Sequence, residues 1–165
     1  MKTFRTTFAI LLISILAFSS CKKKKDETPA PIPATNYFLK AKIDGVVYNA
    51  DGIRVTASRT ADRLTIGSVL PDNRNFEIIL NNTMSLRSYL TNNEFDGLRM
   101  AFSDGTLATA VFNTSRCDGR GTLTINALST TEVAGTFSFT GKRTGGCTLV
   151  GKVITEGEFK CGIIQ

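Results

Sequence analysis

Residues 121–141 read GTLTINALSTTEVAGTFSFTG, and this stretch decides the fold class. Thr, Ser and Asn are among the residues at the even-numbered positions of this stretch. Apolar side chains occupy odd-numbered positions: Leu123, Ile125, Ala127, Val133, Phe137 and Phe139. A period of two is typical of a β-strand that has one buried and one solvated face. The stretch therefore predicts two antiparallel strands joined by a turn near residues 129–132.

The same alternation extends outward through most of residues 37–165. It predicts a hairpin over 37–51 and further strands over 53–58, 76–81, 98–103 and 149–160. In the predicted strand over 53–58, Ile53 is expected on the buried face, and in the one over 149–160, Val153 and Phe159 are expected there. Five Asp-Gly pairs fall along this part of the chain, and Asp-Gly suits the left-handed φ values of tight turns. We therefore expect an all-β fold, an antiparallel β-sandwich or meander barrel of roughly 8–10 strands.

The first twenty residues have the composition of an export signal. Lys2 and Arg5 precede residues 9–18, which read AILLISILAF and are apolar except for Ser14. A basic start, a short apolar run and small residues before a cleavage point make up the signal-peptide pattern. Ten helical residues rise only about 15 Å, about half of a bilayer core, so a permanent spanning helix is the weaker interpretation.

The residues at the predicted cleavage point, Phe18-Ser19-Ser20-Cys21, resemble the lipobox of bacterial lipoproteins. In that family the Cys becomes the first mature residue and carries acyl chains, although Leu is commoner than Phe at the position of Phe18. The resemblance implies lipidation of Cys21 and an outer-membrane lipoprotein of the cell envelope, facing either the periplasm or the outside. A soluble secreted protein with an incidental Cys is the alternative.

Residues 21–36, CKKKKDETPAPIPATN, predict a lipidated, extended tether before a β domain over 37–165. Three of the four prolines alternate here, and sixteen residues of polyproline II would span about 50 Å. Lys22 to Lys25 either touch anionic headgroups or are solvated linker charge. Residues 37–165 hold 14 basic and 12 acidic side chains, so we expect a membrane partner through the anchor and no nucleic acid.

Four segments of the predicted domain resemble a known family: AKIDG at 41–45, GTLTI at 121–125, GTFSF at 135–139 and TEGEF at 155–159. Together they are similar to small bacterial lipoproteins whose C-terminal β domain has no assigned function. The resemblance covers both ends of residues 37–165 and little of 52–120. It implies a β fold and an envelope location, and it supplies no catalytic residue.

Three cysteines lie in the predicted domain, and an exported protein meets an oxidising compartment that favours their pairing. If residues 121–128 and 133–143 form a hairpin, Cys117 lies level with about Arg143, and the next turn brings Cys147 to the same end. Cys161 ends the following strand at the opposite end, beyond disulfide reach. We therefore predict a Cys117–Cys147 disulfide with Cys161 free, while the other pairings remain open.

The chain contains no His, which removes the commonest general base and every Ser-His or Cys-His nucleophile pair. Glu156 and Glu158 stand at i and i+2, with Cα atoms about 6.8 Å apart if the strand is regular. Such a carboxylate pair could serve glycoside hydrolysis, but Lys152 and Lys160 nearby favour a solvated charge ladder. No C-x-x-C, calcium-loop or phosphate-loop motif occurs, so we expect no metal, no cofactor and no catalysis.

These observations lead to one functional hypothesis and two alternatives. The first is a lipid-anchored envelope β domain that binds a protein or glycan partner, or has a structural role. The second is a barrel that holds a small apolar ligand among its Phe side chains. The third is a glycan-acting hydrolase built on Glu156 and Glu158.

Overall fold

The computed structural model describes residues 36–81, 84–105, 110–115, 117–143, 147–148 and 150–164. The predicted leader, Cys21 and nearly all of the predicted tether lie outside these residues. The described part is built of eleven strands and one 3-10 turn: β1 (Phe38–Ile43), β2 (Val46–Asp51), η1 (Gly52–Arg54), β3 (Val55–Arg59), β4 (Leu64–Val69), β5 (Arg74–Leu80), β6 (Ser88–Leu90), β7 (Leu98–Asp104), β8 (Val111–Asn113), β9 (Arg120–Leu128), β10 (Glu132–Arg143) and β11 (Lys152–Ile164).

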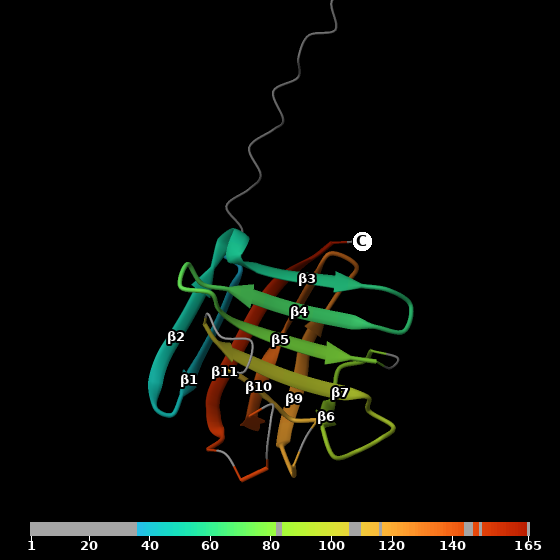
Figure 1. The fold of residues 1–165 in the computed structure, drawn as a ribbon. Coiled ribbons are helices and arrows are strands. Elements are labelled where there is room, and N and C mark those ends of the chain that lie inside the picture. The colour runs from blue at the N-terminus through green and yellow to red at the C-terminus, as the bar shows by residue number, and fades with distance from the viewer. Residues whose placement is uncertain are drawn as a thin grey trace, which may run out of the picture. The chain divides into compact units, whose positions relative to one another are not determined.

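The predicted all-β fold is confirmed, and the strand count exceeds the expected range because β6 and β8 are three-residue strands. The strands form two layers. Layer A has the order β2-β1-β11-β10-β9-β6, and layer B has the order β3-β4-β5-β7-β8. Figure 1 shows β3, β4, β5 and β7 crossing in front of β9, β10 and β11 at a steep angle. The fold thus has the two packed layers of a sandwich.

Two long strands of layer A also join the layers into a closed hydrogen-bonded circuit. The end of β11 pairs in parallel with β3, through Ile163 and Ile164, whereas the other pairings are antiparallel. The end of β10 pairs with β8, through Lys142 and Arg143. Because β10 and β11 also pair with each other, the circuit runs β11-β3-β4-β5-β7-β8-β10 and returns to β11. Closure of this kind is typical of β-barrels, in which it leaves no strand edge of the circuit unpaired.

Aromatic side chains from both layers meet in the interior. The Phe76 ring of layer B lies 4.8 Å from the Tyr48 ring, 5.0 Å from Phe102 and 5.5 Å from Phe137, and Phe137 lies 6.4 Å from Phe159. Burial of each such side chain contributes about 1.5–3 kcal/mol. The rings occupy the space between the layers that an internal apolar ligand would need.

The buried face differs from the prediction at two β-bulges. Val153 is 49% exposed, while its neighbour Ile154 and the later Phe159 are buried. The registers of β11 with β1 and with β10 both shift around Glu156, where φ is +51°. A bulge inserts one unpaired residue, so the alternation changes parity there. A second register shift, between β9 and β10, leaves Ala127 exposed although we expected it to face inward.

The strand predicted over 53–58 begins two residues later than expected. Ile53 belongs to the 3-10 turn and is 98% exposed, so its expected inward position is wrong. Gly52 at φ +56° starts this turn and takes the chain out of β2. The predicted strands also omitted β4, whose buried face carries Leu64, Ile66 and the hydroxyl-bearing Ser68.

Candidate functional site

The disulfide is the one predicted from the hairpin geometry. Cys117 and Cys147 are bonded, with Cα atoms 5.2 Å apart, and they tie the segment before β9 to the segment before β11. Cys161 is free and fully buried opposite Val133, at the other end of the β10–β11 pair. Burial raises the pKa of the Cys161 thiol to about 12, so it remains a neutral, small apolar group.

Glu156 and Glu158 form the expected charge ladder with different lysines. Glu158 lies 2.7 Å from Lys40 Nζ and Glu156 lies 2.8 Å from Lys42 Nζ, so both partners come from the neighbouring strand β1. The lysines named from the sequence pair elsewhere, Lys160 with Glu132 at 3.3 Å and Lys152 with Asp44 at 2.9 Å. These are exposed ion pairs, which typically contribute 0–1 kcal/mol each.

A groove of about 930 Å³ crosses the outer face of layer B. Its central row follows the strand registers from Thr56 through Gly67 and Glu77 to Ala101. Polar side chains flank this row on both sides: Ser58, Thr65, Asn75 and Ser103. The rest of its lining includes Arg54, Pro71 and a set of apolar side chains: Ile53, Val69, Leu70, Val111 and Ile164.

Gly67 deepens the groove. A Cβ atom placed there would have its nearest neighbours, the Phe76 carbonyl oxygen and Thr56 Oγ1, at 3.8 Å, an ordinary van der Waals distance, so the groove has room for a methyl group at this point. The Glu77 carboxylate stands beside this opening and has no ion pair with any described residue. The groove floor therefore combines one carboxylate with hydroxyl and amide groups that both donate and accept hydrogen bonds.

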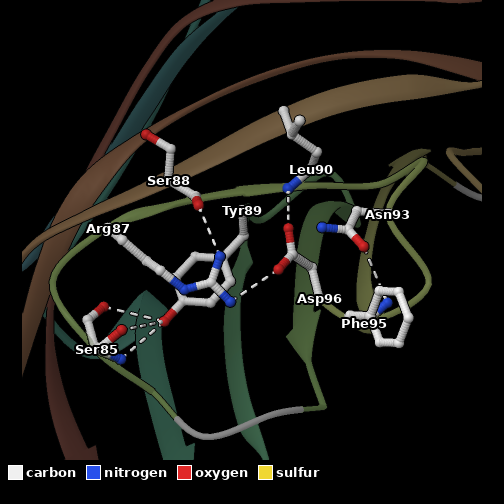
Figure 2. Close-up of polar contacts among 8 residues, drawn as sticks. All are labelled: Ser85, Arg87, Ser88, Tyr89, Leu90, Asn93, Phe95 and Asp96. Carbon is white, nitrogen blue, oxygen red and sulfur yellow. Dashed lines mark hydrogen bonds and ion pairs between the residues drawn. The ribbon is translucent and has the colours of Figure 1, made fainter.

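A second polar cluster holds the segment from β6 to β7. Asp96 is buried, and its Oδ1 lies 2.8 Å from Arg87 Nη2, while its Oδ2 accepts a 2.8 Å hydrogen bond from Leu90 N–H. The Arg87 guanidinium lies over the Tyr89 ring, 3.9 Å from its centroid, and the Tyr89 hydroxyl bonds the backbone of Ser85 (Figure 2). Burial by itself would raise the pKa of Asp96, but the hydrogen bonds from Leu90 and Arg87 outweigh it and lower the pKa.

The Arg87–Asp96 pair also covers the outer edge of β6. Arg87 C=O and Thr91 N–H face β9, since they bond Ile125 N–H at 3.0 Å and Gly121 C=O at 3.1 Å. The backbone groups of the intervening Ser88 and Leu90 must therefore face away from β9. Arg87 Nη1 donates to Ser88 C=O at 3.1 Å, and Asp96 accepts from Leu90 N–H (Figure 2).

The sequence marked Asp96 only as part of an Asp-Gly turn, and it did not mark Arg87 or Gly67. Asp-Gly was a true signal for the turn, because Gly97 has φ +58°. No local pattern distinguishes a carboxylate that bonds the edge of a preceding strand from one that bonds only within its own turn.

Among the residues that the structure describes, no group of three His, Cys, Asp or Glu side chains is placed to hold a metal ion. Among the same residues, no helix has the length and apolar composition needed to cross a membrane.

The fold, the disulfide and the groove define a small, all-β, disulfide-bonded module. Residues 35–161 match the family described as "Domain of unknown function (DUF6252)", and the chain belongs to this family. No curated protein and no solved structure matches the chain.

Proposed function

We propose that the chain is a lipid-anchored module of the bacterial cell envelope that acts by binding rather than by catalysis. The observation that carries this proposal is the Cys117–Cys147 disulfide, because such bonds form and persist in oxidising compartments outside the cytosol. The leader and the Phe18-Ser19-Ser20-Cys21 segment agree with export and with lipidation at Cys21.

The surroundings of the acidic side chains support a non-catalytic role. Glu156 and Glu158 are paired with lysines on the exposed face of layer A. Asp96 is occupied by Arg87 and by the backbone of Leu90. These three carboxylates are thus arranged as in structural ion-pair networks, and the pKa of Asp96 is lowered, which is the opposite of what a general acid requires.

The groove on layer B is the binding surface in this proposal, and its ligand is a glycan chain. A glycan presents rows of hydroxyl groups, which hydroxyl, amide and carboxylate side chains bind by donating and accepting hydrogen bonds. The floor around Gly67 offers these groups from four neighbouring strands, and Ile53 and Ile164 offer apolar contact for sugar ring faces. A protein ligand is the competing outcome.

The anchor is tested by labelling with a fatty-acid analogue in a bacterium that processes lipoproteins. We expect the wild-type chain to take up label and to sediment with membranes, and Cys21→Ala to lose both properties. Cys161→Ala is the matched control, because that thiol is buried and should not be acylated. Unchanged membrane retention of Cys21→Ala would overturn the anchor.

The binding surface is tested with soluble envelope and dietary polysaccharides and with the variant Gly67→Val. The new side chain fits its own strand and fills the groove, so we expect affinity to fall by about tenfold, about 1.4 kcal/mol. Ser138→Val, which adds the same side chain to the exposed face of layer A, should bind as the wild type does. Glycan cleavage that disappears in Glu156→Gln would instead establish the hydrolase alternative.

A further inference from the structure

The two edge strands of layer A, β6 and β2, differ in whether their outward backbone groups are hydrogen-bonded. At the β6 edge, the outward C=O of Ser88 and the outward N–H of Leu90 are both occupied by the Arg87–Asp96 pair. At the opposite edge stands β2, for which β1 is the one strand partner among the described residues. Exposed strand edges template pairing with another chain, and proteins commonly block those that must remain single.

The backbone phase of β2 follows from its register. Gly52 N–H donates to Tyr37 C=O at 2.9 Å, and the pairing continues without a shift to the turn at Asp44-Gly45. Since hydrogen-bonded and non-hydrogen-bonded pairs alternate in an antiparallel ladder, the N–H and C=O groups of Val47, Asn49 and Asp51 point away from β1. No hydrogen bond between described residues uses the outward groups of Val47 or Asn49.

The β2 edge has few of the features that commonly discourage pairing. Its six residues, VVYNAD, include no Pro and no Lys, their one charged side chain is the terminal Asp51, and the ladder with β1 has no bulge. Val46 and Val47 are 65% and 67% exposed, and Val has a high preference for strands. Figure 1 shows β2 at the outer margin of its layer.

We propose that β2 is the edge through which two copies of this chain pair, antiparallel about a two-fold axis through Asn49. In this register Asn49 faces Asn49 of the second copy, and Val47 faces its Asp51. This antiparallel self-pairing places all three outward-facing residues opposite a strand partner, with the Asp51 C=O also accepting the first hydrogen bond of η1. A shift by one residue would place the exposed face of one copy next to the buried face of the other.

The signs of the charges along this edge suit a second copy as the occupant. On the exposed face of layer A, Val47 lies directly opposite Lys42 of β1, and Lys42 and Asp51 pair with Glu156 and Arg54 of their own copy. The two-fold pairing adds Asp51 of one copy to the cross-strand row that contains Lys42 of the other, so it brings a carboxylate toward a lysine and not toward a second carboxylate. At the axis, two neutral Asn amides face each other, so no like charges are opposed.

Cross-linking in membranes is the first test. In the full chain carrying Asn49→Cys, the two introduced thiols would face each other, with Cα atoms about 5.5 Å apart, within disulfide range. Mild oxidation of membranes from cells that express this variant should give a covalent homodimer on a non-reducing gel. Asn126→Cys, exposed on β9, should stay monomeric. Failure of the Asn49→Cys variant to cross-link, or its capture of a different protein, would overturn the proposal.

Sedimentation of the detergent-solubilised full chain at matched density is the second test, and it uses Asn49→Asp. Within one copy the new carboxylate lies opposite Lys40, so the fold should be kept, but across the axis two carboxylates oppose each other. We expect a wild-type dimer whose dissociation constant rises by about fivefold or more in Asn49→Asp, and not in the control Asn126→Asp. A monomeric wild type, or a dimer insensitive to Asn49→Asp, would exclude β2 as the interface.

Discussion

The carboxylate of Asp96 and the guanidinium of Arg87 lie 2.8 Å apart, and together they occupy two outward backbone groups of β6, the N–H of Leu90 and the C=O of Ser88. The side chain of Asp96 is only 4% exposed, whereas that of Arg87 is 43% exposed. Asp96 therefore depends on Arg87 for compensation of its buried charge, while the Arg87 side chain retains access to water. This asymmetry makes Asp96 the partner of the pair that is more sensitive to substitution.

Replacing Asp96 with Asn should destabilise the fold by about 1–3 kcal/mol, because a buried group loses charge-assisted hydrogen bonds to Leu90 N–H and Arg87. Urea unfolding measures the change. Asp62→Asn, at an exposed turn, serves as the control and should change stability by less than about 0.5 kcal/mol. Equal effects of the two substitutions would show that the buried pair has no special role.

Acid should destabilise the protein through the same group. The folded state lowers the pKa of Asp96, and it also lowers that of Asp44, which accepts a hydrogen bond from Val153 N–H and pairs with Lys152. A lowered pKa contributes stability that is fully present well above the unfolded value of about 3.9 and is lost as pH falls through the folded pKa. We expect the urea concentration at the unfolding midpoint to decrease as the pH is lowered below about 4. In Asp96→Asn this decrease should be less steep. Identical pH profiles for the two proteins would remove Asp96 from this account.

Reduction of the Cys117–Cys147 disulfide should cost about 3.5 kcal/mol in the chain-entropy model, given a sequence separation of 30 residues. The double variant Cys117→Ser/Cys147→Ser, compared with the wild type by thermal unfolding, measures this cost.

Cys161 should resist thiol reagents in the native protein and react only after denaturation, because it is buried and its pKa is raised to about 12. Rapid native labelling of Cys161 would contradict its position in the core.

Gly135→Ala should be more disruptive than its single methyl group would indicate. A Cβ atom at this position would lie 2.9 Å from the Phe159 ring and would also contact the Thr124 carbonyl oxygen, both at the packed centre of layer A. Overpacking of this kind typically costs about 1–3 kcal/mol. Gly67→Ala is the matched control, since a Cβ atom at that glycine would make only ordinary van der Waals contacts at 3.8 Å, and its stability should equal or exceed that of the wild type. Similar unfolding midpoints for the two variants would disprove the close contact.

Much of the fold follows from residue alternation. The parity of Leu123, Ile125, Phe137 and Phe139 placed these side chains correctly in the core, and hairpin geometry was enough to pair Cys117 with Cys147. The turn at Asp44-Gly45 also formed as expected, with both residues at positive φ.

The errors have a common physical origin. A bulge changes the parity of a strand without a clear sequence signal, which is why the positions of Val153 and Ala127 were wrong. The partners of Glu156 and Glu158 lie on β1, more than a hundred residues away in the chain, so local spacing could not identify them. The groove over Gly67 depends in the same way on which strands become neighbours.

Processing and lipidation of the chain can be measured together by intact-mass analysis of the native protein extracted from membranes. We expect a chain that begins at Cys21 and is heavier than its amino-acid sequence by the mass of the attached acyl groups. A mass that includes residues 1–20, or a Cys21 without any modification, would contradict it.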